Sequence, residues 1–271
     1  MALDPPSPSA PNFLAHVASA YAALIESPQT DRASGLGGKL FYAGELDEPG
    51  RALLVAANIA GAATLAATAD RAAQKQALRD GVADFVVNNL DEALRILKNQ
   101  LRKRETVAVL VALPPSNIEQ EMNERGVQPD LLRGNVPIAP LHPALTYEHN
   151  SQVSIQSDAT TELGPGKPPA LVTWRVSSLL PKDLAALDEI ALACLDPEDW
   201  KSRRWLRLAP RYLGRMAQGL RLLNSDREFS ARFIDHIRQS ANRGEIAFAF
   251  EVSVQTRGAV PDQFPFDPTK P

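Results

Sequence analysis

Cysteine is nearly absent from this sequence of 271 residues, which contains only Cys194. A single cysteine excludes an internal disulfide framework and is typical of a reducing compartment. An excess of one charge is also missing, because 29 Lys and Arg residues are balanced by 32 Asp and Glu residues, a formal net charge of −3. This balance provides no general attraction to nucleic acid or to an acidic membrane surface, so we expect neither partner.

Long hydrophobic runs are scarce as well. The longest weakly polar window, Ala52–Ala69, consists mostly of Ala, Gly and Thr, contains Asn58, and changes to a strand pattern after Gly61. It therefore predicts a buried helix followed by a strand rather than a membrane span. The first twelve residues are rich in Pro and Ser and lack both a basic start and an apolar run, so we expect no targeting signal and a cytoplasmic protein.

Histidine occurs only four times, and His142 and His149 both lie in one long stretch, residues 132–166. This stretch is polar and rich in proline, and a loop of such length is usually functional, disordered or an arm that reaches another subunit. The two histidines are its candidates for proton transfer, although His142, between Leu141 and Pro143, is equally suited to packing or to the surface. No clean pair of helical ligands occurs in the sequence, so we expect no metal site.

Alternating strand and helix patterns dominate residues 35–131. Four apolar runs predict strands, at Lys39–Ala43, Thr64–Ala69, Ala83–Val87 and Thr106–Ala112. Each is followed by a helical pattern, and such alternation predicts a parallel sheet with helices on its faces. Ligands of these sheets bind beyond the carboxyl ends of the strands. We therefore predict an α/β fold whose main part is a Rossmann-like parallel sheet with flanking helices.

The loop Gly44–Gly50, which follows the first predicted strand, is the first candidate for a cofactor site. Glycine allows backbone N–H groups to approach a phosphate at the start of a helix, and Arg51 adds a positive charge there. The same loop contains Glu45, Asp47 and Glu48, which would repel phosphate. An ordinary connection between strand and helix is therefore an equal alternative, with Gly44, Gly50 and Arg51 as the cofactor-binding candidates.

Asp70 is the fourth candidate for cofactor binding. It follows the second predicted strand, where a carboxylate would hold a ribose in a dinucleotide-binding fold. The same position is equally suited to the N-cap of the next helix. The sequence alone leaves both roles open.

The last third of the chain predicts a smaller α+β portion. Ala170–Val176 and Glu245–Val254 alternate in polarity, which predicts half-buried strands that we expect to be antiparallel partners. Three helices are expected between them, the second with a buried face made of Leu213, Met216, Leu220 and Leu223. Cys194 lies on the apolar face of the first, so we expect a core thiol. Residues 261–271 are expected to form an extended tail that contacts a neighbour.

The segment Lys201–Arg215 is strongly basic and includes Trp205 and Tyr212. Aromatic residues between cations are typical of nucleic-acid surfaces. A solvated basic face with aromatic anchors, or a subunit contact, explains the same pattern, and the net charge favours this second interpretation. The predicted organisation is an N-terminal arm and helix (residues 1–34), the Rossmann-like domain (residues 35–150) and the α+β portion (residues 151–271).

Several motifs in the central region agree in order and spacing with a known family. A GGKLF strand is followed by a glycine-containing loop, an apolar helix with Ile59, Ala60 and Gly61, a helix that begins with Leu90–Ala93, and the turn Arg125–Asp130, which reads RGVQPD. This part of the chain resembles the central domain of urocanase, the urocanate hydratase. The resemblance covers about a third of the sequence.

The resemblance implies a Rossmann-like domain that binds NAD, a nicotinamide that acts as an electrophile toward the imidazole of urocanate, and addition of water by a hydro-lyase. Asp130, from the matching turn, joins His142 and His149 of the long polar stretch as the candidate catalytic residues. The chain departs from the family in its glycine loop, which reads GELDEPG, and after the Pro-Asp turn, where LLRGNVPIAPLHPALTYEHN stands. No counterpart of the catalytic cysteine segment is present.

Two functions follow from these observations. The first is a urocanase-like lyase, or a descendant with altered activity, which binds NAD or a similar nucleotide together with a small-molecule ligand. The alternative is a non-catalytic interaction protein that uses a Rossmann-like scaffold for assembly. In both cases we expect a homo-oligomer.

Overall fold

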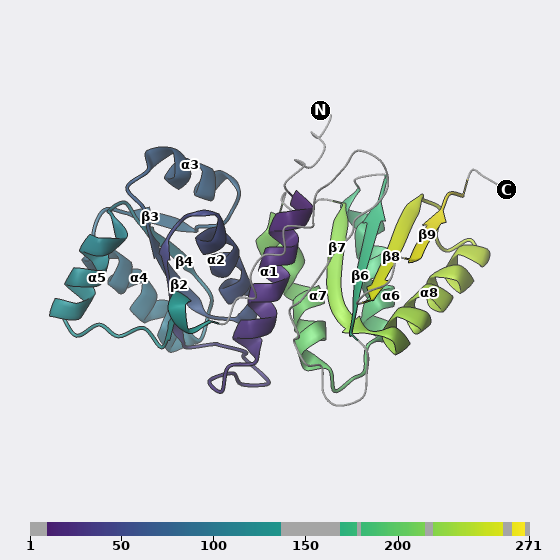
Figure 1. Cartoon of the computed structure of the whole chain (residues 1–271), viewed down its shortest axis with the longest axis horizontal. Helices are drawn as coiled ribbons and strands as arrows, with labels where there is room; N and C mark the ends of the chain where they lie inside the picture. The colour runs from purple at the N-terminus through teal and green to yellow at the C-terminus, as the bar shows by residue number, and fades with distance from the viewer. Residues whose placement is uncertain (1–9, 137–168, 178–179, 215–218, 257–261, 269–271) are drawn as a thin grey trace. The chain divides into compact units, whose positions relative to one another are not determined.

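The computed structural model describes residues 10–136, 169–177, 180–214, 219–256 and 262–268 (Figure 1). The chain forms two compact units, residues 13–139 with 208–215 and residues 1–12, 140–207 and 216–271. The first unit contains a parallel sheet and the second a smaller antiparallel sheet. The predicted fold class, a Rossmann-like α/β sheet with an additional α+β portion, is confirmed. Within the described ranges, no helix is long and apolar enough to cross a bilayer.

The sheet of the first unit has five strands: β1 (Leu40–Glu45), β2 (Ala63–Ala67), β3 (Phe85–Val87), β4 (Ala108–Val111) and β5 (Leu131–Leu132). Their order is β3-β4-β2-β1-β5, and all neighbours are parallel. The chain leaves β1 toward β2 and later returns on the other side of β1 as β5. A change of direction of this kind marks the place where a doubly wound sheet opens a crevice at its carboxyl edge.

Helices cover the sheet on both faces (Figure 1). They are α1 (Ala10–Ile25), α2 (Glu48–Ala60), α3 (Arg71–Arg79), α4 (Leu90–Lys103) and α5 (Pro115–Glu124). Helix α2 packs against β1 and β2, and α3 packs beside β3. Apolar residues of α4 and α5 form one core cluster with the opposite face of the sheet, including Leu65, Val109, Leu94, Leu97, Ile118 and Met122.

Local sequence explains these elements. Strands β2 and β4 are completely buried, as expected of parallel strands covered on both faces. Helix α4 begins at the N-cap Asn89, whose side chain accepts a hydrogen bond from Glu92 N at 2.9 Å, and its last turn carries Arg102 and Lys103. Acidic first turns and basic last turns complement the helix dipole, so the basic end of α4 has a structural explanation.

The second unit contains strands β6 (Pro169–Val176), β7 (Leu220–Asp226), β8 (Phe250–Thr256) and β9 (Asp262–Phe266), in the antiparallel order β7-β6-β8-β9. Helices α6 (Pro181–Cys194) and α8 (Arg227–Asn242) pack against the sheet and each other, and α7 (Trp200–Leu213) precedes β7. The predicted antiparallel pairing of Ala170–Val176 with the later strand is confirmed.

One prediction in this unit is wrong. Leu220 and Leu223 belong to strand β7 and not to a helix, because α7 ends at Leu213 and both Gly214 (φ +49°) and Gly219 (φ +75°) adopt left-handed conformations. Within the expected extended tail, β9 pairs with β8 along its whole length, and contact of the tail with a neighbouring chain stays a prediction. Cys194 is buried, as predicted, and burial raises the pKa of its thiol.

Candidate functional site

The carboxyl ends of β1 and β5, where the topology of a doubly wound sheet places the ligand crevice, are the candidate site. Strand β1 ends there in Gly44 (φ +71°) and Glu45, and β5 ends there in Leu132, followed by Arg133. A Cβ atom on Gly44 would first meet the side chain of Arg133, at 4.0 Å. Residues from two distant parts of the sequence therefore meet at this edge, as the topology requires.

The start of helix α2 is occupied by a side chain of its own loop. Asp47 is the N-cap, and its Oδ1 accepts a hydrogen bond from the backbone N–H of Gly50 at 2.8 Å. A carboxylate at this position satisfies an N–H group that has no partner within the helix and interacts favourably with the helix dipole. In a dinucleotide-binding sheet, these are the interactions that a phosphate makes.

Arg133 completes this arrangement from the other side of the crevice. Its guanidinium donates to both carboxylate oxygens of Asp47, at 2.9 and 3.0 Å, and to the carbonyl oxygen of Glu45 at 3.4 Å. The Asp47 and Arg133 side chains are about half and one-third exposed, so the pair lies at the mouth of the crevice. We refer to Asp47, Gly50 and Arg133 as the Asp47 clamp.

Gly50 allows helix α2 and strand β1 to pack closely at the Asp47 clamp. A Cβ atom at this position would lie 2.0 Å from the carbonyl oxygen of Glu45 and 2.9 Å from Asp47 Oδ1. Only glycine allows the first turn of α2 to approach the end of β1 so closely. The absence of a side chain at Gly50 therefore brings α2 and β1 together. The space beside Gly50 is filled by Glu45 and Asp47 and not left open to a ligand.

The other cofactor-binding candidates are engaged elsewhere. Arg51 forms an ion pair with Asp80, with 2.6 Å between Nη2 and Oδ2, and so points toward the end of α3. Asp70 is the N-cap of α3, where its Oδ1 accepts from Ala72 N at 2.7 Å. Of the two roles that the sequence left open for Asp70, the cap is the one observed. These side chains are not gathered around a common ligand position.

Of the three predicted catalytic residues, Asp130 lies in the described part of the chain. Asp130 lies at the amino edge of the sheet, where its carboxylate accepts from Leu40 N at 2.9 Å and from Lys39 Nζ at 3.2 Å. The candidate catalytic residue Asp130 is therefore not beside the cofactor-binding candidate Gly44, because Asp130 precedes β5 whereas Gly44 stands near the end of β1. His142 and His149 lie outside the described residues.

Tyr42 and Glu119 form a polar pair that the sequence did not single out. The Tyr42 hydroxyl, on β1, donates to Glu119 Oε1, in the second turn of α5, at 3.2 Å. Burial, followed by the charge of Glu119, raises the pKa of Tyr42 above its usual range. The phenol therefore stays protonated near neutral pH and acts as a hydrogen-bond donor, not as a base. An inward tyrosine in a predicted strand was the only available signal.

His16 is a second residue without a sequence signal. It lies on α1 within an apolar helical pattern, and its Nδ1 is buried with no hydrogen-bond partner among the described residues. Burial lowers the pKa of His16, and the nearby charge of Glu48, in the first turn of α2, partly opposes this. His16 is therefore favoured in its neutral form beside the start of α2.

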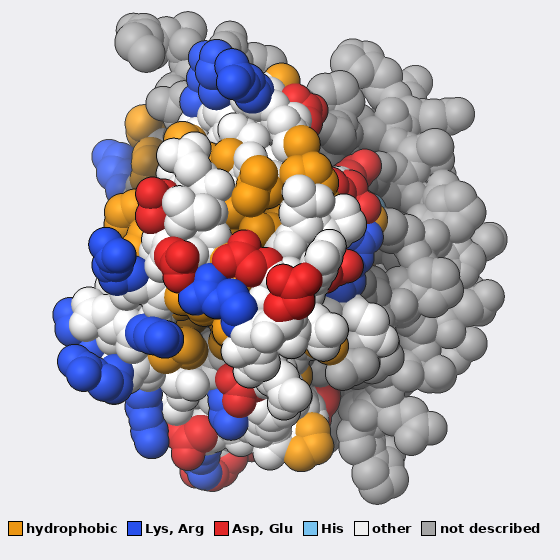
Figure 2. Space-filling view, turned by 90° about the vertical axis from the view of Figure 1, so that its left-hand side faces the viewer, with side chains coloured by type: hydrophobic (Ala, Val, Ile, Leu, Met, Phe, Trp, Pro, Cys, Tyr) orange, Lys and Arg blue, Asp and Glu red, His pale blue; other side chains and the backbone are white. Residues whose placement is uncertain are grey.

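Within the described residues, the charged surface, the basic segment Lys201–Arg215 and the potential metal ligands do not indicate a second site. Figure 2 shows basic and acidic side chains interspersed on the side of the first unit that carries β3 and α5. In the basic segment, Arg203 donates to the carbonyl oxygens of Leu192 and Leu195, and the guanidinium of Arg211 lies 5.4 Å from the ring centre of Tyr212. In the described part of the chain, no group of three or more His, Cys, Asp or Glu residues could hold a metal ion.

A dinucleotide does not fit the described residues of this crevice. A pyrophosphate would have to displace the Asp47 carboxylate from Gly50 N and would meet Glu45 and Glu48 nearby, so only Arg133 would attract it. The carboxylate at the ribose-binding position, Asp70, uses its Oδ1 to cap helix α3. The strand and helix are arranged as in a nucleotide-binding sheet, and the Asp47 carboxylate lies where the phosphate of a nucleotide would bind.

Comparison with known families agrees with this outline. The model of the urocanase family described as the urocanase Rossmann-like domain matches residues 17–159. The matched segment begins within α1 and contains all five strands of the parallel sheet, together with the Asp47 clamp. It covers more than half of the chain, and the chain therefore belongs to the urocanase family.

Proposed function

We propose that this chain is a non-catalytic member of the urocanase family, whose Rossmann-like unit serves as a scaffold for binding and assembly. The observation that carries the proposal is the Asp47 clamp, in which a carboxylate accepts from Gly50 N and is held by both arms of the Arg133 guanidinium. A helix start that is already neutralised by its own loop offers no position to a phosphate.

The charge around the clamp supports the same conclusion. Glu45 and Glu48 lie close to Asp47 in the sequence, so this loop carries three carboxylates, of which Asp47 is paired with Arg133. At short range, like charges in a partly desolvated site repel an incoming anion. Tyr42, which stays protonated, supplies a hydrogen-bond donor but no base, and Asp130 lies at the opposite edge of the sheet.

The competing function is the urocanate hydratase reaction with bound NAD, and family membership favours it. Native mass spectrometry of the purified full-length chain separates the two. We expect only masses of the polypeptide or its multimers without bound NAD, no binding heat on titration with NAD, and no loss of the ultraviolet absorption of urocanate when the protein and NAD are added. Co-purified NAD, or turnover of urocanate, would overturn the proposal.

An assembly role is supported by the edge of the parallel sheet. Strand β3 is the outermost strand, and the side chain of Phe85 on it is 47% exposed. Exposed edge strands present unpaired backbone groups and apolar side chains, and they pair readily with another chain. We therefore propose that the protein forms homo-oligomers in which this edge takes part.

A further inference from the structure

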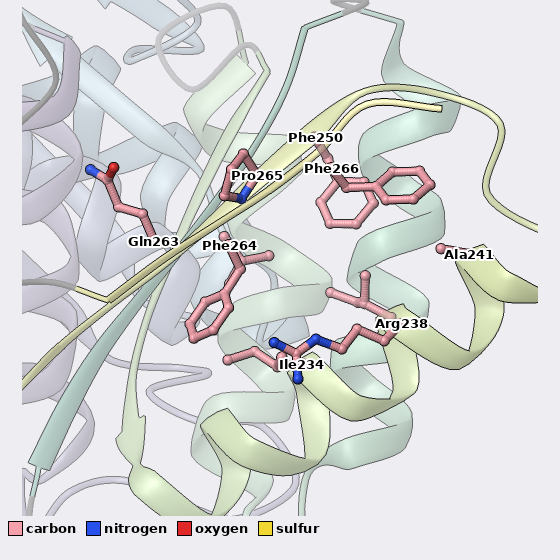
Figure 3. Close-up of a pocket in the computed structure, with 10 residues that line it drawn as sticks. Ile234, Arg238, Ala241, Phe250, Gln263, Phe264, Pro265 and Phe266 are labelled. Atoms are coloured by element: carbon pink, nitrogen blue, oxygen red, sulfur yellow. The ribbon is translucent and has the colours of Figure 1, made fainter. Parts of the chain in front are cut away.

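The second unit contains a pocket of about 300 Å³ between helix α8 and the strand pair β8–β9 (Figure 3). Its base is formed by Ile237 and Val252, which are almost completely buried and belong to the core of this unit. Its volume is at the lower end of the range for small-molecule sites, which are typically apolar with a few polar groups. The pocket lies in a different unit from the Asp47 clamp.

Aromatic side chains from β9 form one wall of the pocket. Phe264 and Phe266 are two residues apart on this strand and therefore project from the same face of the sheet. Phe266 stacks on Phe250 of β8, with 5.0 Å between ring centres and 25° between the planes. Flat and rigid walls of this kind favour an aromatic or branched apolar body over a long flexible chain.

Arg238 supplies positive charge at the mouth of the pocket. Its guanidinium lies 5.3 Å from the ring centre of Phe264, and Figure 3 shows the side chain extending from α8 beneath the aromatic wall. The pair that it forms with Asp235 is long, at 4.0 Å, and both side chains are more than half exposed. Such a pair is weak, so it leaves most of the charge available to a ligand.

We propose that this pocket binds a small carboxylic acid with an aromatic or branched apolar body. The carboxylate pairs with the Arg238 guanidinium, which matches the geometry of two carboxylate oxygens. The apolar body lies against Phe264, Phe266 and Ile237. The proposal concerns a site of the second unit and does not depend on the state of the Asp47 clamp.

The test uses three probes on the full-length protein, with binding measured by isothermal titration and by saturation-transfer NMR. These probes are 3-phenylpropionate, its uncharged amide, and acetate. We expect 3-phenylpropionate to bind at one site, the amide to bind at least about tenfold more weakly, and acetate not to bind, since the acid needs both its ring and its charge. Equal affinity of acid and amide would overturn the proposal.

Three variants locate the site. Arg238→Gln removes the charge at an exposed position, so we expect it to weaken 3-phenylpropionate about tenfold and to leave the amide unchanged. Ala241→Leu extends a side chain into the pocket and should reduce the affinity for both probes. Arg207→Gln, at an exposed arginine of the same unit, serves as the matched control and should change neither. Binding that survives both Arg238→Gln and Ala241→Leu would place the ligand elsewhere and refute the assignment.

Discussion

Asp47 determines what the start of helix α2 can bind. Its carboxylate accepts from Gly50 N and is held by Arg133, so a protein side chain performs the role that a phosphate has in related sheets. Serine is also a good N-cap and carries no charge. Exchange of Asp47 for serine therefore separates the capping role from the electrostatic one.

We expect Asp47→Ser to create affinity for inorganic phosphate that the wild-type protein lacks. The variant keeps a cap at α2 but leaves Arg133 without its carboxylate partner, so phosphate should raise the melting temperature by a few degrees, or about 1 kcal/mol. Differential scanning calorimetry with and without phosphate measures this. The double variant Asp47→Ser/Arg133→Gln should lose the effect, and an unchanged melting temperature of the single variant would contradict the proposed role of Asp47.

At Gly50 we expect a substitution that usually stabilises helices to destabilise the protein. Alanine is preferred over glycine inside helices by about 1 kcal/mol. At Gly50 the added Cβ would lie 2.0 Å from the Glu45 carbonyl oxygen, so we expect Gly50→Ala to destabilise the protein by about 1–3 kcal/mol. Urea unfolding measures the loss. Gly134→Ala, where a Cβ would meet nothing within 4 Å, is the matched control.

His16 makes stability depend on pH. Burial lowers its pKa from 6.5 in the folded protein, so protons bind more strongly to the unfolded chain. The contribution of His16 is therefore fully present above pH 6.5 and is lost as the pH falls through the folded pKa. We expect the difference in unfolding free energy between wild type and His16→Gln to shrink between about pH 8 and about pH 5. A difference that stays constant across this range would contradict the buried, neutral state of His16.

At the scale of elements, four of the five parallel strands could be predicted, because each lies in a short apolar run; β5 has only two residues and gives no such signal. The positions of the helices followed from caps such as Asn89 and from terminating glycines such as Gly61, which is in the left-handed conformation at φ +106°. The order of the strands could not be predicted, because it depends on pairing between distant residues. The position of Asp130 has another cause: it precedes the two-residue strand β5, which the sequence did not reveal, and it therefore lies at the amino edge beside Leu40.

The error at Leu220 and Leu223 has a different physical reason. Their spacing from Leu213 fits one helical face, and a period of three to four residues can arise by chance across a turn. Gly214 and Gly219 break the helix, and β7 then finds its place beside β6. For the Asp47 clamp, the sequence indicated the acidic loop, but its partner Arg133 comes from a strand end that only the fold brings near.

Helix α4 provides a prediction at this scale. Its C-cap, Arg104, is the only residue other than glycine with positive φ in the described part of the chain, at 58°. Left-handed backbone costs such a residue about 1 kcal/mol, and glycine avoids this cost. We expect Arg104→Gly to stabilise the protein by up to about 1 kcal/mol, and Arg102→Gly, within the helix, to destabilise it by about the same amount. Thermal unfolding monitored by circular dichroism compares the two, and destabilisation by both would refute the argument.

At the scale of the whole molecule, the parallel sheet ends on one side in β3, with Phe85 exposed. We expect Phe85→Glu to shift the protein toward smaller assemblies, because a charge on an edge strand opposes pairing with another copy. Native mass spectrometry and light scattering report the distribution. Leu180→Glu introduces the same charge at a side chain that is also 47% exposed and serves as the control. A mass distribution unchanged by Phe85→Glu would exclude this edge as the interface.

The Asp47 clamp also determines the order of substitutions by which an anion site could arise at this edge of the sheet. Loss of Arg133 first would leave three neighbouring carboxylates uncompensated, a poorer starting point than the present one. Loss of Asp47 first would release a cation and a helix start together, and later substitutions at Glu45 and Glu48 could then improve on it. An anion site is therefore reached by a preferred order of substitutions, in which the exchange of Asp47 comes first.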